Sequence, residues 1–343
     1  MKFNKLFFMF LFFSATVFAQ TDTSETIVVL GGQDGALAYN QGITDANKRD
    51  LDKSLENFSR ALGYAPRYSK ALYNRGIIYL EKQMNKEALQ DLTDAVISDK
   101  AKPQYYLARA IAHARLKNFE NAYKMVRKAE LMDYNKSEIQ YFYGYVYFME
   151  ERYALAEKSF TEAIKCNEKF AYAYCDRAAA RFRQGNLKAA LEDYTKALEI
   201  KPNAVFIYTL RSEVKAAQNN FNGAIEDINS AMEIDTENEV IYLNDRANMY
   251  VRAKKYKLAI KDFNTCMEKY PKNTDAYINY GNMLMGQKKY AEAEQYYTKA
   301  IEKDYNNIAA YNNRANAKEL QFNLKGAEAD KRIAKHLIEK QKQ

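Results

Sequence analysis

Residues 171–204, AYAYCDRAAARFRQGNLKAALEDYTKALEIKPNA, contain the pattern that decides the fold. Ala190 and Ala197 are seven residues apart, so they lie on one face of a helix, where small side chains let a second helix approach closely. Tyr194, a large side chain, lies between them. The pattern recurs every 34 residues along most of the chain, with one extra residue near position 239. The later of the two small residues is, in successive copies, Ala61, Ala95, Ala129, Ala163, Ala197, Ala231, Cys266, Ala300 and Ala334.

The period divides the chain into nine repeats that cover residues 35–341. Their ranges are 35–68, 69–102, 103–136, 137–170, 171–204, 205–238, 240–273, 274–307 and 308–341. The four prolines, Pro66, Pro103, Pro202 and Pro271, all fall at the junctions between repeats. Since a proline inside a helix costs about 3 kcal/mol, these junctions should lie between helices. We expect each repeat to form two antiparallel helices and neighbouring repeats to stack, because one helix pair cannot bury its apolar face alone.

Glycine and tyrosine recur in the first half of the repeats. Position 8 is Gly42, Gly76, Gly144 and Gly281 in four repeats, and position 11 is Tyr79, Tyr147 and Tyr250 in three. With the later small residues, this order resembles the tetratricopeptide repeat, whose pattern is W-x2-L-G-x2-Y, then A-x3-F, then a late proline. The tryptophan position carries tyrosine instead, as Tyr106, Tyr174, Tyr208, Tyr277 and Tyr311. The resemblance covers nearly all of the chain after residue 34. It implies an all-α fold, a right-handed α-α superhelix or solenoid of about nine helix hairpins, that binds protein or peptide partners.

The composition excludes several other classes of protein. Of the 343 residues, 48% are hydrophobic, which is too many for a disordered chain, and only 12 Gly and 4 Pro occur, which disfavours an all-β sandwich. Three Cys and two His leave little for a metal site or a Cys/His catalytic pair, and no phosphate-loop, zinc-protease or serine-hydrolase motif is present. We therefore expect no catalytic residues, no metal, no cofactor and no enzyme activity. The net charge of +8 arises from lysines interleaved with glutamates, so we expect no nucleic-acid partner.

The N-terminus reads as an export signal. Residues 1–19, MKFNKLFFMFLFFSATVFA, combine two lysines, an apolar run of about 13 residues and a small-residue cleavage site ending at Ala19. A helix that spans a membrane needs about 20 apolar residues, so we expect cleavage rather than anchoring, and no second apolar stretch is long enough to span. The signal resembles those of exported bacterial proteins, which places the mature chain in the periplasm or outside the cell. We interpret residues 20–34 as a linker.

An arginine and an aspartate occur together in most of the repeats. Arginine at position 7 and aspartate at position 23 occur in the same five repeats, as Arg75 with Asp91, Arg177 with Asp193, Arg211 with Asp227, Arg246 with Asp262, and Arg314 with Asp330. Repeats 4 and 8 have neither residue, and repeat 3 has Arg109 but Met125 in place of the aspartate. We infer a hydrogen-bonded contact between the two helices of one repeat. The alternative is a set of arginines that line a ligand groove.

The resemblance also implies where a partner would bind. In the tetratricopeptide family the first helix of each pair lines the concave face, and positions 2, 5, 9 and 12 point into it. In repeats 2–5 such positions are apolar, namely Tyr73, Ile77, Leu107, Ile111, Tyr141, Tyr145, Phe148 and Phe182. In repeats 7–9 they are amides, namely Asn244, Asn248, Asn282, Asn312 and Asn316. The hypothesis is a groove with an apolar zone and an amide zone that holds an extended segment; the alternative is packing for the tyrosines and ordinary surface polarity for the asparagines.

Together these features predict a scaffold or adaptor in the cell envelope that binds a protein or peptide. The alternative is a chaperone-like assembly factor for unfolded periplasmic clients. The sequence is also compatible with self-association. Cys166 and Cys175 flank the turn between repeats 4 and 5 and could form a disulfide in an oxidising compartment.

Overall fold

The computed structural model describes residues 32–340 of the chain. These residues form eighteen α-helices and no β-strand, which confirms the predicted all-α solenoid of helix hairpins. The predicted signal peptide, residues 1–19, lies outside the described residues, as does the predicted linker up to residue 31.

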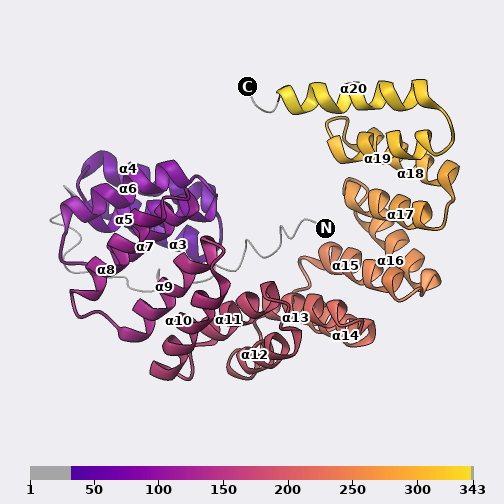
Figure 1. Ribbon diagram of the computed structural model, residues 1–343. Helices are drawn as coiled ribbons and strands as arrows, with labels where there is room; N and C mark the ends of the chain where they lie inside the picture. Colours follow the sequence, from indigo (N-terminus) through magenta and orange to yellow (C-terminus); the bar gives the residue numbers. More distant parts are fainter. Residues whose placement is uncertain (1–31, 341–343) are drawn as a thin grey trace. The chain divides into compact units, whose positions relative to one another are not determined.

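The helices divide between two compact units, and each repeat supplies two of them (Figure 1). The N-terminal unit, described from residue 32 to Pro202, contains α3 (Gln33–Asn47), α4 (Leu51–Tyr64), α5 (Ser69–Glu81), α6 (Asn85–Ser98), α7 (Pro103–Arg115), α8 (Phe119–Glu130), α9 (Lys136–Met149), α10 (Tyr153–Cys166), α11 (Ala171–Arg183) and α12 (Leu187–Ile200). The C-terminal unit, described from Asn203 to residue 340, contains α13 (Val205–Ala217), α14 (Phe221–Ile234), α15 (Glu239–Arg252), α16 (Tyr256–Lys269), α17 (Thr274–Gly286), α18 (Tyr290–Lys303), α19 (Ile308–Glu319) and α20 (Leu324–Lys340).

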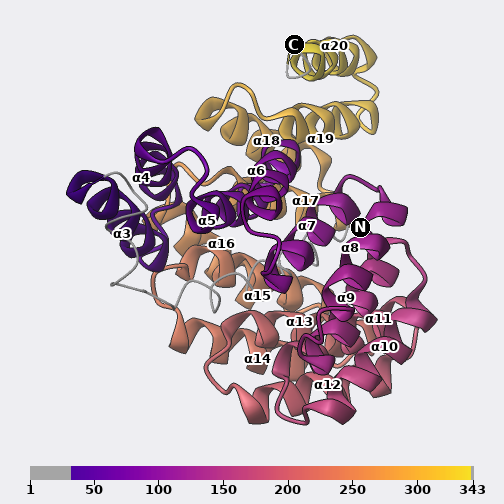
Figure 2. The ribbon, with the colours of Figure 1, turned by 90° about the vertical axis from the view of Figure 1, so that its left-hand side faces the viewer.

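Within each unit the hairpins stack in sequence order (Figures 1 and 2). Successive helices pack against one another, and so do the first helices of adjacent repeats. In the N-terminal unit α7 contacts both α5 and α9, and α9 contacts α11; in the C-terminal unit α17 contacts both α15 and α19. The first helices therefore form a layer in each unit. This layer contains the residues that were predicted from the sequence to bind a partner.

Close approach of the two helices of a repeat explains the glycines at position 8. A Cβ atom on Gly144 would lie 2.6 Å from the ring of Phe160, and one on Gly281 would lie 2.6 Å from the ring of Tyr297. Non-bonded carbon atoms in proteins essentially never come closer than 3.0 Å. A large residue at position 24 therefore fills the space that a side chain at position 8 would need.

The turn between the two helices has the same backbone conformation in every repeat. One residue at position 15 takes a positive φ, and these residues are Arg49, Gln83, Lys117, Glu151, Gly185, Asn219, Lys254, Lys288 and Phe322. The residue after it donates its backbone N–H to a carbonyl of the first helix, as Asp50 does to Asp45 at 2.9 Å. This arrangement ends a helix by satisfying a carbonyl that would otherwise lack a partner. Glycine adopts the required left-handed conformation without strain, yet only Gly185 does so in these nine turns.

The first helix begins two residues before the expected start of the array. α3 includes Gln33 and Asp34, which the sequence analysis assigns to a linker. Gly32 precedes the helix with a φ of 135°, and Asp34 lies in the first turn, where a negative charge interacts favourably with the helix N-terminus. The assignment of these two residues to a linker is therefore wrong.

Candidate functional site

The arginine and aspartate at positions 7 and 23 meet in all five repeats that contain both. The arginine Nε and Nη2 atoms donate to the two carboxylate oxygens of the aspartate at distances from 2.7 to 3.0 Å. The pairs are Arg75–Asp91, Arg177–Asp193, Arg211–Asp227, Arg246–Asp262 and Arg314–Asp330. The aspartate side chains are 3–7% exposed and the arginine side chains 12–22%. Because the Nε and Nη2 atoms of each arginine both donate to the aspartate, these arginines join two helices and do not line a ligand groove.

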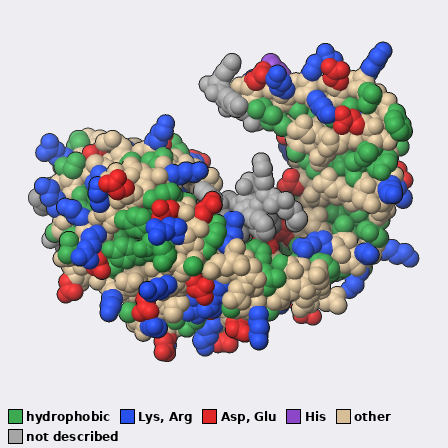
Figure 3. Space-filling view, in the orientation of Figure 1, with side chains coloured by type: hydrophobic (Ala, Val, Ile, Leu, Met, Phe, Trp, Pro, Cys, Tyr) green, Lys and Arg blue, Asp and Glu red, His purple; other side chains and the backbone are tan. Residues whose placement is uncertain are grey.

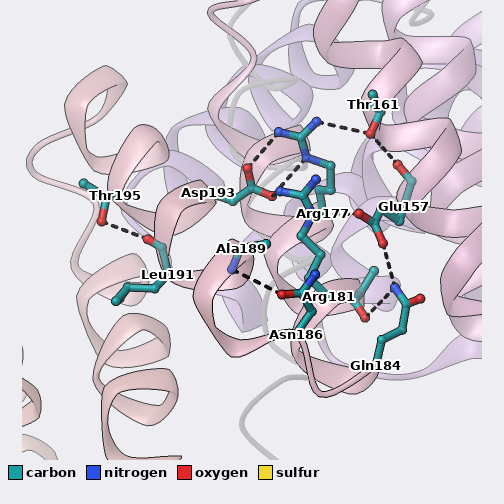
Figure 4. Close-up of polar contacts among 11 residues, drawn as sticks. Glu157, Thr161, Arg177, Arg181, Gln184, Asn186, Ala189, Leu191, Asp193 and Thr195 are labelled. Atoms are coloured by element: carbon teal, nitrogen blue, oxygen red, sulfur yellow. Dashed lines mark hydrogen bonds and ion pairs between the residues drawn. The ribbon is translucent and has the colours of Figure 1, made fainter. Parts of the chain in front are cut away.

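The same arginines also reach the preceding repeat. The free Nη1 atom of Arg177 donates to Thr161 Oγ1 at 3.1 Å, as Figure 4 shows, and Arg75 donates in the same way to Ser59 Oγ. Arg246 and Arg314 make the equivalent contacts in the C-terminal unit. Each of these side chains therefore ties three helices together, which fixes the register of one repeat on the next.

A second basic group strengthens three of the pairs. Arg181 Nη1 donates to Asp193 Oδ2 at 2.8 Å, and Lys318 Nζ donates to Asp330 Oδ2 at 2.9 Å. Burial by itself would raise the pKa of the Asp330 carboxyl, but the hydrogen bonds from Arg314 and Lys318 outweigh it and lower that pKa. Lys215 lies 2.9 Å from Asp227 in the same position.

The repeats that lack the pair use tyrosine instead. In repeat 4, Tyr143 Oη donates to Glu130 Oε2 at 2.9 Å. In repeat 8, Tyr280 and Tyr296 stack with ring centroids 4.2 Å apart. In repeat 8 the replacement again joins positions 7 and 23, whereas in repeat 4 position 7 contacts the preceding repeat instead.

Most of the apolar candidates for partner binding are buried. Tyr73, Ile77, Leu107, Ile111, Tyr141 and Tyr145 are at most 9% exposed, so the prediction that they line an open groove is wrong. The reason is that the first helix of each repeat packs on that of the next. Tyr73 stacks on Tyr105 with centroids 4.8 Å apart, and Tyr141 Oη donates to Asp176 Oδ2 at 2.6 Å. Phe148, which packs edge-on against Tyr153, and Phe182 are half-buried.

Asp176 is a buried carboxyl that sequence reasoning missed. It is 2% exposed and lies on α11 against α9. Burial raises its pKa to about 7, and the hydrogen bond from Tyr141 offsets only part of that effect. The sequence feature that could have indicated it is an acidic residue among the alanines and tyrosines of residues 171–180.

The amide candidates separate into two groups. Asn244 is buried, and its Nδ2 donates to the backbone carbonyl of Val240 at 3.1 Å, while Asn248 is half-buried. The prediction of an exposed binding role for Asn244 is therefore wrong, because its side chain is buried on α15. Asn282, Asn312 and Asn316 are exposed on α17 and α19.

An exposed apolar cluster follows these amides and was also missed. Leu320, Phe322 and Leu324, at the turn between α19 and α20, are 50%, 91% and 65% exposed. The signal was a phenylalanine at position 15, where all other repeats carry a polar residue or glycine. On the face shown in Figure 3, lysine and arginine are interspersed with aspartate and glutamate on both units, and hydrophobic side chains are also visible there.

The cysteines form no disulfide. Cys166 is exposed, whereas Cys175 and Cys266 are buried, and all three are free thiols. Between residues 32 and 340, no group of three His, Cys, Asp or Glu side chains is arranged to hold a metal ion. In the same span, no helix combines the length and apolar character needed to cross a bilayer.

Comparisons with known proteins agree with the repeat pattern. Family profiles described as tetratricopeptide repeat match residues 39–106, 107–169, 171–204 and 250–317. Hsp70-Hsp90 organizing protein 1 of Glycine max is 29% identical over 183 residues, a match that covers 43% of this chain and 32% of that protein. The chain thus spans about a third of the length of that relative.

Two solved structures share the fold. PilW, a widely conserved type IV pilus biogenesis factor, matches with a TM-score of 0.51 at 16% identity, over 61% of this chain and 96% of that one. A chain of the APC/C hetero-tetramer Cut9-Hcn1 matches with a TM-score of 0.54 at 14% identity, over 88% of this chain and 58% of that one.

Proposed function

Because the chain belongs to the tetratricopeptide repeat family, we propose that it is an adaptor that holds other proteins and performs no chemistry of its own. The relative named Hsp70-Hsp90 organizing protein supports a role in bringing protein partners together. The proposed contact surface is the amide face of α17 and α19, which we define as Asn282, Asn312 and Asn316.

The exposure of Asn312 and Asn316 is the observation that carries this proposal. They lie four residues apart on α19, so they share one face, and neither side-chain amide makes a hydrogen bond to another described residue. Asn282 lies on the adjacent α17, where its Oδ1 accepts hydrogen bonds from Tyr297 Oη at 2.8 Å and from Asn313 Nδ2 at 3.1 Å. That leaves its own Nδ2 available as a donor. Amides donate and accept at once, so this face suits the backbone of an extended segment.

The test is partner capture by the full chain and by two variants. Cross-linking in the native cells followed by purification identifies the partner, whose binding is then measured for the double variant Asn312→Ala, Asn316→Ala. The matched control is Asn306→Ala, an exposed asparagine in the turn before α19. We expect the double variant to lose roughly tenfold or more in affinity, since each amide hydrogen bond contributes about 1 kcal/mol. Equal affinity of the double variant and the control would refute the amide face.

The proposed location is the periplasm or the exterior of a bacterial cell. Residues 1–19 support it through their paired lysines, apolar run and terminal Ala19. Mass spectrometry of the protein purified from its native source should give a mature N-terminus at Gln20. An intact N-terminus in the cytoplasmic fraction would exclude export.

A chaperone-like role is the second candidate, and the exposed apolar cluster Leu320, Phe322 and Leu324 favours it. Exposed apolar groups bind the apolar segments of unfolded chains. A chaperone of this kind should suppress the aggregation of an unrelated, thermally unfolding protein, and Phe322→Ser should weaken that suppression. An adaptor should leave aggregation unchanged and should bind its own partner at a fixed ratio.

A further inference from the structure

Repeat 3 contains an arginine at position 7 without the aspartate that accompanies it elsewhere. In five other repeats that arginine donates through Nε and Nη2 to a carboxylate within 3.0 Å. In repeat 3 the arginine is Arg109 on α7, and the residue at position 23 of α8 is Met125. Repeat 3 therefore has the arginine donors at this position but lacks the carboxylate that accepts from them in the other repeats.

No other described residue has taken the place of the aspartate. The Nε atom of Arg109 is buried and has no hydrogen-bond partner, and no described carboxylate forms an ion pair with this side chain. Thr93 occupies the position that in other repeats accepts the third arginine contact, and its hydroxyl donates to the carbonyl of Leu89 at 2.6 Å, as Thr161 donates to Glu157. No hydrogen bond among the described residues joins Thr93 to Arg109. Burial lowers the pKa of the Arg109 guanidinium, and the nearby Tyr106 counteracts only part of this effect.

A second donor lies one helical turn further along α7. His113 is 6% exposed, and neither of its ring nitrogens has a hydrogen-bond partner. Side chains four residues apart on a helix are neighbours, so the imidazole lies beside the guanidinium. Burial, and then the charge of Arg109, lower the pKa of His113, which keeps the ring neutral and leaves one N–H to donate.

We propose that Arg109 and His113 form a binding site for an external carboxylate, which accepts from the Arg109 fork in place of the missing aspartate. The five internal pairs serve as templates for the geometry, because each holds a planar carboxylate against the same fork. An unpaired guanidinium that is partly withdrawn from water is costly, and an incoming anion removes that cost.

A small ligand or an acidic side chain would reach the buried Nε atom of Arg109 past the side chain of Met125. Arg109 is only half-buried, and so is Met125, the side chain that stands in the carboxylate position. Methionine has an unbranched side chain with several rotatable bonds, so it can move aside without a change in the backbone. The inference is independent of the proposed adaptor role, since the amide face of α17 and α19 belongs to the other unit.

The test compares the full chain with Met125→Asp and Met125→Leu. The aspartate should restore the internal pair and thereby block the site while raising the melting temperature, so loss of binding cannot be attributed to unfolding. The leucine keeps the slot apolar and should behave as the original chain does. Acetate is the probe, exchanged for chloride at constant ionic strength, and the readout is the Nε–Hε resonance of Arg109 in the ¹H–¹⁵N spectrum, identified by its loss in Arg109→Lys.

We expect a saturable shift of the Arg109 resonance in the original chain and in Met125→Leu. In Met125→Asp the resonance should already lie among those of the paired arginines, with affinity for acetate reduced roughly tenfold or more. A resonance that does not respond to acetate, or one that shifts equally in Met125→Asp, would overturn the site. His113→Leu should weaken acetate binding roughly threefold, and unchanged affinity there would overturn the assignment of His113.

Discussion

The stability of the N-terminal unit should fall as the pH rises from about 4 to about 7 because of Asp176. This carboxyl is buried between α9 and α11, with Tyr141 Oη as its donor at 2.6 Å. Its pKa rises from 3.8 to about 7 on folding. A group whose pKa is raised in the folded state stabilises the fold fully below its unfolded pKa, and this contribution is lost as the pH rises towards the folded pKa. At about 1.4 kcal/mol per pKa unit, the loss between pH 4 and pH 7 is about 4 kcal/mol.

The assay is urea unfolding followed by circular dichroism at several pH values between 4 and 8, for the original chain and for Asp176→Asn. The amide has the same shape but no charge, so the stability difference between the two proteins isolates the titration of this one group. The variant should gain stability relative to the original chain by about 4 kcal/mol as the pH rises from 4 to 8.

Two further variants sharpen this prediction. Tyr141→Phe removes the hydrogen bond that lowers the pKa of Asp176, so the loss of stability should extend to higher pH. Glu192→Gln, an exposed carboxylate on α12, is the control and should follow the original chain. A stability difference between Asp176→Asn and the original chain that stays constant from pH 4 to 8 would refute the reasoning.

Three other substitutions test the packing. Phe322→Gly should raise the urea midpoint by the equivalent of about 1 kcal/mol, because Phe322 has a φ of 62° and is 91% exposed; a lower midpoint would contradict this. Gly144→Ala should lower the free energy of unfolding by about 1–3 kcal/mol, because its Cβ would lie 2.6 Å from the ring of Phe160. Gly63→Ala, whose Cβ would meet nothing within 4 Å, should be neutral or stabilising. Thermal melts that rank the two variants in the opposite order would be inconsistent with the packing. Asp193→Asn should cost about 3–5 kcal/mol in urea unfolding, since it leaves two partly buried guanidinium groups without their charge partner; a change below about 1 kcal/mol would show that the pairs are dispensable.

The helix pairs and their Arg–Asp contacts could be predicted because they depend on residues close in sequence. Arg177 and Asp193 lie 16 residues apart in one hairpin, and their joint presence or joint absence across repeats indicates the contact. The same comparison identified repeat 3 as the exception, and the unpaired Arg109 is the structural consequence.

The burial of Tyr141 and Tyr145 could not be predicted in the same way. It depends on how closely α9 and α11 approach, and that distance is set by packing between repeats rather than by the pattern within one. The expectation that these tyrosines line an open groove failed for this reason. Asn244 and Asn312 occupy equivalent positions of their repeats, yet one is buried on α15 and the other is exposed on α19. Within residues 32–340, α17 packs on α15 and no further first helix packs on α19, so contacts between repeats decide the exposure.

Site-specific photo-cross-linking in the native cells tests the adaptor proposal most directly. A photoreactive amino acid placed at Asn316, on the exposed amide face of α19, should cross-link a defined partner protein, whereas the same group at Asn306 should not. Partner cross-links of equal yield from both positions, or from Asn306 alone, would contradict the claim that this face holds the partner.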